Sequence, residues 1–499
     1  MTPQAIRLFK LLLGFLISAR LVLLVFAPHT DPSESRYAEI ARKMVETGDW
    51  ITPQFDYGVP FWAKPPLSMW MSALGIDLFG TNEFGSRIFI FLAALVVLAL
   101  VADSARKELL GKGSGWIAAT FLTGMPLFFY CSGAVMTDLA LLLGTTLAMT
   151  GFLDAMRGGS KFSGYRMFIG LAIGLLAKGP LVGVIALPPL AAWLLLTGRW
   201  RTAWKDLPWL SGTLLMLALA VPWYGVAERK TPGFLDYFLI GEHWKRFTVR
   251  GWQGDLYGNA HPVAPGTIWL HLLLGTFPWC LGLLALPLRR WREFRGWAMA
   301  DDARGLYWLL WAVWPVAFFT PARNIIATYP LPALPALALL LTELSLRPRA
   351  PGLRRFLPPH PALAAITVLI VGWGIVVSLF LPAHALKHSE RVLVERFGRE
   401  QMAGDHLIYY GPRKYSAEFY SEGAVDHTTS AAAVADRLDA PGRTFVAIPA
   451  YWLPLVPPPL RRRLQPVATW GPGPSLYVER ADTPEMAGID PSRTPAIGN

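Results

Sequence analysis

Charged residues are scarce in this sequence of 499 residues. Only 16% of them are Asp, Glu, Lys or Arg, whereas soluble domains contain about 25%. Hydrophobic side chains make up 53% of the chain and aromatic ones 13%, and the mean hydropathy is +0.38. This composition excludes a disordered chain, an ordinary cytosolic enzyme and a nucleic-acid-binding domain, so nucleic acid is not an expected partner. It predicts a polytopic protein surrounded by membrane lipids.

Cysteine is equally scarce, because Cys131 and Cys280 are the only two. Two cysteines cannot form a disulfide framework. Both lie beside apolar runs, and we interpret them as small buried hydrophobic side chains rather than as a redox pair.

Long apolar runs are abundant, and each can be compared with the ~20 residues that cross a bilayer. The first run follows Arg7 and Lys10 and has no signal-peptide cleavage site after it, so it predicts a retained first helix. The two runs beside Lys178 are short, which leaves a re-entrant or broken arrangement open. We expect about 11–13 transmembrane helices, and the candidate runs are 11–28, 87–104, 115–130, 138–155, 167–178, 181–198, 208–226, 266–288, 304–320, 327–344 and 361–382.

Lysine and arginine gather in alternate loops. If the N-terminus is in the cytoplasm, every short cytoplasmic loop holds at least three of them, as the positive-inside rule requires. The net charge of +12 therefore sets the topology and does not indicate an anionic partner. Three long segments, 29–86, 227–265 and 383–499, are then expected on the extracytoplasmic face.

These boundaries predict two domains. Residues 1–382 form an all-α membrane domain that includes the first two long segments, and residues 383–499 form a small extracytoplasmic α/β domain. In the second domain, residues 406–410, 444–449 and 475–480 have the pattern of strands and 431–438 that of a helix. The last fifteen residues have the composition of a disordered tail.

The first long loop carries the strongest candidates for chemistry. Residues 31–50 have the periodicity of an amphipathic helix that lies on the membrane surface. Asp31 and Glu34 fit a capping box with Pro32 at the first helical position. Carboxylates at this boundary can instead act as the general base on an acceptor.

Four further charged residues have a functional and a structural interpretation. Arg36 and Lys64 can pair with phosphate oxygens, or Arg36 pairs with Glu39 on the same helix and Lys64 extends to the membrane interface. Asp138 begins a predicted helix and is costly near hydrocarbon, which makes it a functional candidate, or it is a helix cap. Lys178 interrupts an apolar stretch, either as a functional residue or as an anchor at a break.

The second long loop places His243, Arg246 and His261 among aromatic residues. This combination suits a polar head group with a sugar, although aromatic residues at an interface are more often anchors. Two isolated histidines do not make a metal site. No cofactor is therefore firmly predicted, and no ligand pattern supports a divalent metal.

Taken together, these segments resemble the bacterial membrane glycosyltransferases with the GT-C fold. The nearest families are the aminoarabinose transferases of lipid A and the protein O-mannosyltransferase-like proteins, and the resemblance covers roughly residues 5–345. It rests on the order and spacing of S-E-S-R-Y-A-E-I (33–40), G-D-W-I-T-P (48–53), K-P-P-L (64–67), Asp138, A-K-G-P (177–180), E-H-W-K-R-F (242–247), A-H-P (260–262), F-P-W (277–279) and T-Y-P-L-P-A-L-P (328–335).

The resemblance implies an inverting glycosyltransferase of the bacterial inner membrane. Such enzymes move a sugar from a polyprenyl (undecaprenyl) phosphate carrier to an acceptor on the periplasmic face, and the acceptor can be lipid A, another envelope glycan or a protein. The implied catalytic acids are Glu34, Asp31 and Asp138. The implied residues for the donor phosphate and substrate are Arg36, Tyr37, Lys64, Lys178, His243, Arg246 and His261.

Three positions depart from the family pattern. The family has an Asp where this chain has Ser33, which leaves Asp31 or Glu34 as the base. Ala63 replaces an acid that looks like a metal ligand in the aminoarabinose transferases, and Ile325 replaces a basic residue. These departures predict a donor or an acceptor other than aminoarabinose and lipid A.

Two other functions compete with the enzyme. A transporter or flippase of lipid-linked sugars is the alternative, but such proteins commonly contain inverted repeats, and we find no convincing repeat in this sequence. A non-catalytic protein of envelope assembly that kept the fold is the third hypothesis.

Overall fold

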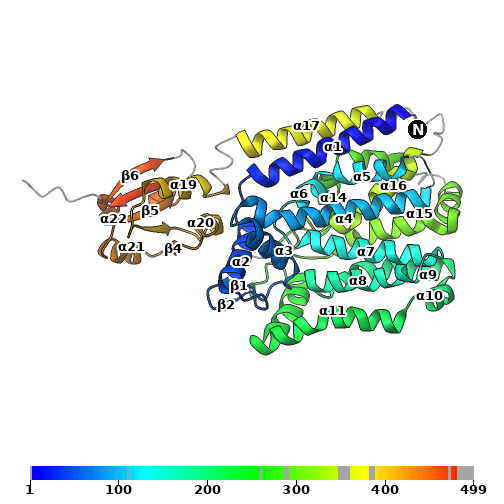
Figure 1. The fold of residues 1–499 in the computed structure, drawn as a ribbon, viewed down its shortest axis with the longest axis horizontal. Helices are drawn as coiled ribbons and strands as arrows, with labels where there is room; N and C mark the ends of the chain where they lie inside the picture. Colours follow the sequence, from blue (N-terminus) through cyan, green and yellow to red (C-terminus); the bar gives the residue numbers. More distant parts are fainter. Residues whose placement is uncertain are drawn as a thin grey trace, which may run out of the picture. The chain divides into compact units, whose positions relative to one another are not determined.

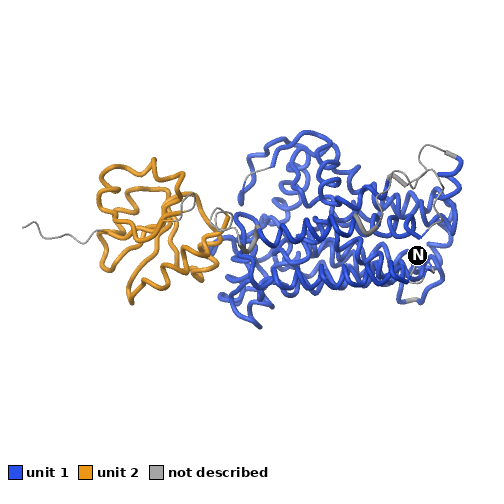
Figure 2. Tube along the Cα trace, turned by 90° about the horizontal axis from the view of Figure 1, so that it is seen from above, with its two compact units in different colours: residues 1–381 blue, residues 382–499 orange. Residues whose placement is uncertain are grey.

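The computed structural model describes residues 3–109, 111, 113–258, 261–285, 291–346, 360–380, 388–469 and 474–479. The chain divides into two compact units, Met1–Leu381 and Pro382–Asn499, which Figure 2 colours separately. Each unit has its own hydrophobic core.

The first unit is a bundle of helices that run side by side (Figure 1). Each of the eleven predicted apolar runs contains helix within the described residues, although 115–130, 266–288 and 327–344 are each interrupted, and the predicted all-α membrane fold is confirmed. Among the described residues, four helices, α1, α4, α7 and α11, are long and apolar enough to cross a membrane. The bounds are α1 Pro3–Phe26, α4 Glu83–Leu109, α5 Ser114–Thr123, α6 Pro126–Cys131, α7 Asp138–Met156, α8 Lys161–Lys178, α9 Leu181–Thr197, α11 Trp209–Lys230, α14 Thr267–Thr276, η2 Trp279–Ala285, α15 Trp291–Phe319, η3 Leu331–Ala333, α16 Leu334–Leu346 and α17 His360–Phe380.

Helices α7 and α8 pack with their backbones in contact. A Cβ atom added at Gly144 would lie 2.7 Å from the Gly170 carbonyl oxygen, and one added at Gly170 would lie 2.5 Å from that of Gly144. Small residues permit such close approach between membrane helices. The contact matters for the site because α7 begins at Asp138 and α8 ends at Lys178.

The two short runs beside Lys178 are separate helices. Helix α8 has 18 residues and α9 has 17, so at 1.5 Å per residue each is just shorter than the ~30 Å hydrocarbon core. The chain turns between them at Gly179, whose φ of +65° favours glycine. The turn therefore leaves Lys178 at the end of a helix, beside the loops described next.

One end of the bundle is covered by the two long loops, and we call it the site end. The other end carries α10 (Trp200–Asp206), and we call it the opposite end (Figure 1). A short antiparallel hairpin follows the first helix of the site end. The elements of the site end are α2 Ser33–Thr47, β1 Gln54–Asp56, β2 Val59–Pro60, α3 Leu67–Phe79, α12 Phe234–Asp236, η1 Tyr237–Lys245 and α13 Arg246–Thr248.

The second unit is a five-stranded mixed sheet with helices on both faces. The strand order is β4-β3-β5-β7-β6, in which β4, β3 and β5 are parallel and β7 is antiparallel to both its neighbours. The fully buried β5 and the mostly buried β3 lie where the sequence predicted strands, whereas β6 buries few residues and was missed. The predicted disordered tail lies outside the described residues. The bounds are α19 Arg391–Glu400, β3 His406–Tyr410, α20 Tyr415–Tyr420, β4 Val425–Thr428, α21 Ala431–Leu438, β5 Thr444–Pro449, α22 Pro458–Arg463, β6 Leu464–Thr469 and β7 Pro474–Glu479.

Candidate functional site

Two of the predicted residues form a buried ion pair. The Lys178 Nζ lies 2.8 Å from Asp138 Oδ1, and the two side chains are 8% and 6% exposed. The same ammonium lies 5.3 Å from the centre of the Tyr329 ring. Helix α7 begins at Asp138, and its cap, Thr137, makes no side-chain capping bond. The aspartate is therefore a partner of Lys178 at the helix start, as the α7–α8 packing allows.

A second cluster joins the two long loops. The Lys64 Nζ lies 2.7 Å from Glu242 Oε2, and Arg246 donates to the same carboxylate at 3.2 Å and to Asp255 at 3.1 Å. Burial alone would raise the pKa of Glu242, but Lys64 and Arg246 outweigh burial and lower it. Glu242 is thus a buried carboxylate held between two cations, and Lys64 is bound within the site instead of extending to the membrane interface.

His243 connects the two clusters. Its Nδ1 lies 2.8 Å from the Phe238 carbonyl oxygen and its Nε2 lies 3.1 Å from the Lys178 carbonyl oxygen. Burial lowers the pKa of His243, and the two carbonyl oxygens oppose this effect. The residue fixes η1 against the end of α8.

His261 lies at the exposed edge of this region. Partial burial and the charges of Arg246 and Arg36 lower its pKa, although the side chain stays exposed. The next residue, Pro262, pairs with Asn324 as an isolated bridge. His261 is therefore near the cations, at the rim of the site.

Arg36 and Tyr37 face the aromatic side of the site. Arg36 donates to the carbonyl oxygen of Tyr257, and its guanidinium lies 5.4 Å from the centre of the Tyr37 ring. Tyr37 is buried and packs edge-on against Phe61 at 6.0 Å. Glu39, the alternative partner considered for Arg36, is bound by Arg42 and Lys43.

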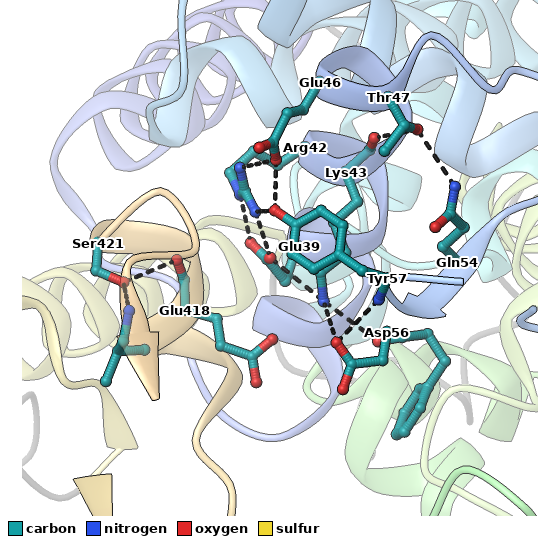
Figure 3. A network of polar contacts seen from close by, with 12 residues as sticks. Glu39, Arg42, Lys43, Glu46, Thr47, Gln54, Asp56, Tyr57, Glu418 and Ser421 are labelled. Carbon is teal, nitrogen blue, oxygen red and sulfur yellow. Dashed lines mark hydrogen bonds and ion pairs between the residues drawn. The ribbon is translucent and has the colours of Figure 1, made fainter. Parts of the chain in front are cut away.

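Glu39 belongs to a network on the far side of α2 (Figure 3). It accepts two 2.8 Å hydrogen bonds from Arg42, and Lys43 lies 3.5 Å from it. All three side chains are at most 5% exposed. Arg42 also contacts Glu46 and Tyr57, which binds α2 to the hairpin. The residues of the predicted helix thus form one helix, and three of its charged side chains are buried and paired, in part with the hairpin.

Glu34 is held by an arginine that the sequence interpretation missed. Arg87 donates to Glu34 from two nitrogens, at 2.9 and 2.8 Å. The backbone N–H groups of Thr30 and Val135 add bonds of 3.3 Å each, and His29 lies 3.5 Å away. Burial alone would raise the pKa of Glu34, but Arg87 and His29 lower it well below the usual range. Arg87 stands at the first position of the predicted apolar run 87–104. Its charge at the end of an apolar run was the only feature of the sequence that could have pointed to a role in the site.

The capping box predicted for Asp31 and Glu34 is not formed. Helix α2 begins at Ser33, its cap is Pro32, and no side chain caps it. Glu34 accepts instead from the Thr30 N–H group, before the helix. Pro32 thus stands at the cap and not at the first helical position, and Asp31 is partly exposed at the entrance to α2.

Several residues of the site were not singled out from the sequence. Glu242 lies four residues before Arg246 on one helical face, which is a signal for an ion pair. Asp255 and Tyr257 gave no signal of their own, and Tyr329 appeared only within the T-Y-P-L-P-A-L-P motif (328–335). Only the fold brings these residues to the site. Within the described residues, no group of three or more His, Cys, Asp or Glu side chains is placed to hold a metal ion.

Comparison with known sequences identifies relatives of this chain. A family model described as dolichyl-phosphate-mannose-protein mannosyltransferase matches residues 5–238. The undecaprenyl phosphate-alpha-4-amino-4-deoxy-L-arabinose arabinosyl transferase of Edwardsiella ictaluri is 32% identical over 372 residues, which are 71% of this chain and 64% of that protein. The protein of the same name from Erwinia tasmaniensis is 33% identical over 365 residues, 70% of this chain and 60% of that one. This chain thus covers less than two thirds of the length of either relative.

Two solved structures share the fold over nearly the whole chain. ArnT from Cupriavidus metallidurans bound to undecaprenyl phosphate superposes with a TM-score of 0.73 at 18% identity, over 95% of this chain and 98% of that one. The structure of the same protein in its apo state superposes with a TM-score of 0.71 at 18% identity, over 94% of this chain and 97% of that one. The resemblance to GT-C glycosyltransferases that the motifs predicted is therefore confirmed.

Proposed function

The chain is a relative of the undecaprenyl phosphate-aminoarabinose transferases and has the ArnT fold, and from this premise we propose that it is an inverting glycosyltransferase. Its donor is a sugar on a polyprenyl (undecaprenyl) phosphate, and its acceptor is lipid A, another envelope glycan or a protein. The observation that carries the proposal is the meeting of Lys64, Arg246 and Lys178 at one end of the bundle, each held by a buried carboxylate.

These cations suit a departing phosphate. Arg246 presents a planar fork and the two lysines present point charges, which together match a phosphate monoester. Because their carboxylate partners are buried, the cations are fixed before the ligand arrives. Prearranged cationic hydrogen-bond donors stabilise charge that develops on the leaving group, which is how electrostatic catalysis lowers a barrier.

We assign the acceptor side to Asp31 and give Glu34 a positioning role. Arg87, His29 and two backbone groups already occupy the Glu34 carboxylate, which leaves it poorly placed to take a proton. Asp31 lies three residues earlier, is partly exposed and stands beside Ser33, where the family carries its aspartate. Asp138 supports the site through Lys178.

The proposed reaction is a single displacement. The acceptor oxygen attacks the anomeric carbon, the bond from that carbon to the phosphate oxygen breaks, and polyprenyl phosphate leaves with both electrons of that bond. The acceptor proton passes to Asp31. Inversion follows because attack and departure occur on opposite faces of the sugar.

We place the site on the periplasmic face of a bacterial inner membrane. The loops of the opposite end contain Arg157, Arg166 and Arg199, and the positive-inside rule assigns such loops to the cytoplasm. The site end then faces the periplasm, as does the second unit, which follows α17.

The proposal can be tested in proteoliposomes that contain the full chain, undecaprenyl-phosphate sugars beginning with 4-amino-4-deoxy-arabinose, and lipid A. We expect product formation that falls at least a hundredfold in Lys64→Ala. The control is Arg201→Ala, an exposed basic residue of the opposite end, which should retain activity. Movement of the donor across the bilayer without product would support the flippase, and full activity of Lys64→Ala would overturn the site.

A further inference from the structure

The two long loops of the site end meet at one buried tyrosine. The Tyr257 hydroxyl donates to the Pro60 carbonyl oxygen at 2.8 Å and accepts from the Trp62 N–H group at 3.0 Å. The side chain is only 5% exposed. One hydroxyl therefore satisfies two backbone groups of the other loop, nearly 200 residues away in the sequence. We call these two hydrogen bonds the Tyr257 clasp.

The ring of Tyr257 is held independently of its hydroxyl. Its centre lies 4.7 Å from that of Phe61, 5.1 Å from that of Phe55 and 5.8 Å from that of Tyr237. Aromatic pairs in such tilted and edge-on arrangements stabilise the packing beyond the area that they bury. A phenylalanine at this position would keep these contacts and lose only the clasp.

The clasp lies between the cations of the site. Trp62 is two residues before Lys64 in the first loop. In the second loop, Asp255 accepts from the Tyr257 N–H group at 3.0 Å and pairs with Arg246 at 3.1 Å. Arg36 donates to the Tyr257 carbonyl oxygen. Whatever fixes Tyr257 therefore fixes the loop that presents Lys64 relative to the loop that presents Arg246.

We propose that Tyr257 is a positioning residue whose hydroxyl fastens the two loops together, so that Lys64 and Arg246 bind one phosphate. The proposal rests on the proposed function, because it assumes that these cations receive a lipid phosphate. Burial raises the pKa of Tyr257 to about 12, so the hydroxyl keeps its proton and remains a donor throughout the physiological range.

The first test measures binding of undecaprenyl phosphate to the full chain in detergent, through the fluorescence of the loop tryptophans. We expect Tyr257→Phe to weaken binding about tenfold, because the two hydrogen bonds of the clasp are lost. In the transfer assay the KM for the donor should rise by a similar factor, while kcat changes less than twofold. A general loss of folding would lower the active fraction and leave KM unchanged.

The second test needs no ligand. Arg250 is exposed in the second loop, and trypsin cleavage after it reports how firmly that loop is held. We expect cleavage to be several-fold faster in Tyr257→Phe. Tyr237→Phe, which removes the bond from the Leu256 N–H group at 3.1 Å and a longer bond to Glu242 at 3.4 Å, should give a smaller change in the same direction.

The matched control is Tyr224→Phe. Its hydroxyl donates to the Leu175 carbonyl oxygen at 2.7 Å within the bundle, so its loss should leave both the cleavage rate and binding unchanged. Wild-type cleavage or binding in Tyr257→Phe would overturn the clasp. If the wild-type chain binds no undecaprenyl phosphate, the proposed function fails, and the cleavage rates alone then decide whether the clasp exists.

Discussion

Both ends of the helix bundle carry networks of ion pairs, but they differ in how deeply the pairs are buried. At the site end the side chains of Asp138, Lys178 and Glu242 are at most 8% exposed. At the opposite end Asp302 is 47% exposed and Lys107 is 48% exposed. Water can therefore solvate Asp302 and Lys107 at the opposite end, but it is largely excluded from Asp138, Lys178 and Glu242 at the site end.

The opposite network joins five helices through their loop ends. Its pairs are Lys107–Asp154 and Arg166–Asp154 at 2.8 Å, Arg157–Glu108 at 3.0 Å, Arg304–Glu343 at 3.2 Å, and Arg157 and Arg199 with Asp302. Arg304–Glu343 and Arg166–Asp154 are largely buried, but the pairs of Asp302 and Lys107, which are about half exposed, contribute about 0–1 kcal/mol each. Breaking a buried pair costs about 3–5 kcal/mol, because one charge is left without solvent or partner. The comparison thus separates a network that fastens loops from one that holds charges ready for a ligand.

Lys178→Met should break the site-end network most severely. The substitution leaves the Asp138 carboxylate buried without its partner, so we expect a loss of about 3–5 kcal/mol of stability and loss of sugar transfer. The melting temperature of the purified chain in detergent and the proteoliposome assay measure the two effects.

The double variant Asp138→Leu/Lys178→Met separates stability from function. Replacing both members of a buried pair by apolar residues is often neutral for stability, so the melting temperature should recover while transfer stays absent. Transfer at the wild-type rate in this double variant would contradict a role for the pair in the reaction.

Arg87→Met should have the next largest effect. Arg87 and Glu34 are 4% and 5% exposed, so breaking this buried pair also falls under the cost of about 3–5 kcal/mol, but Glu34 keeps its bonds to Thr30 and Val135 after the change. We expect a fall in melting temperature smaller than that of Lys178→Met. Arg87→Lys, which keeps the charge and loses the fork, should lie between Arg87→Met and the wild type, and equal melting of all three proteins would exclude this role.

Acid should weaken the site end through Glu34. Its pKa in the folded chain is lowered by Arg87 and His29, below the ~4.3 of an unfolded glutamate. The stabilisation is therefore complete above that value and is lost as the pH falls towards the folded pKa. We expect the melting temperature to fall less steeply between pH 5 and 3 in Glu34→Gln than in the wild type, and parallel curves would contradict the assignment.

Asp302→Asn should have the smallest effect. The residue is about half exposed, so loss of its pairs with Arg157 and Arg199 should cost less than about 1 kcal/mol. Asn also tolerates the positive φ of 63° at this position. Transfer should be unchanged and the melting temperature nearly so. A fall as large as that of Lys178→Met would remove the distinction between the two ends.

The sequence predicts elements better than it predicts contacts. Apolar runs locate the helices because burial in lipid requires length and composition alone. The amphipathic pattern of α2 did not predict that its charges are buried. Their pairing with the hairpin depends on how the short strands fold back onto the helix, which the periodicity of α2 does not show. Likewise Asp138 and Lys178 were separate candidates until the glycines of α7 and α8 brought them together.

The pairing partners of polar side chains were the least predictable feature of the site. Helical spacing offers Glu39 three cations, Arg36, Arg42 and Lys43, and spacing alone does not rank them. Tyr257 carries no motif, and its importance arises only from the meeting of two loops. Long-range polar contacts of this kind depend on the assembled fold and not on any periodicity of the sequence.

The glycine contact between α7 and α8 has a consequence for how the protein tolerates its surroundings. Backbones that already touch cannot be pressed closer by a thicker bilayer or by lateral pressure from lipids. We therefore expect the spacing between Asp138 and Lys178, which stand at the adjoining ends of these two helices, to change little with lipid composition.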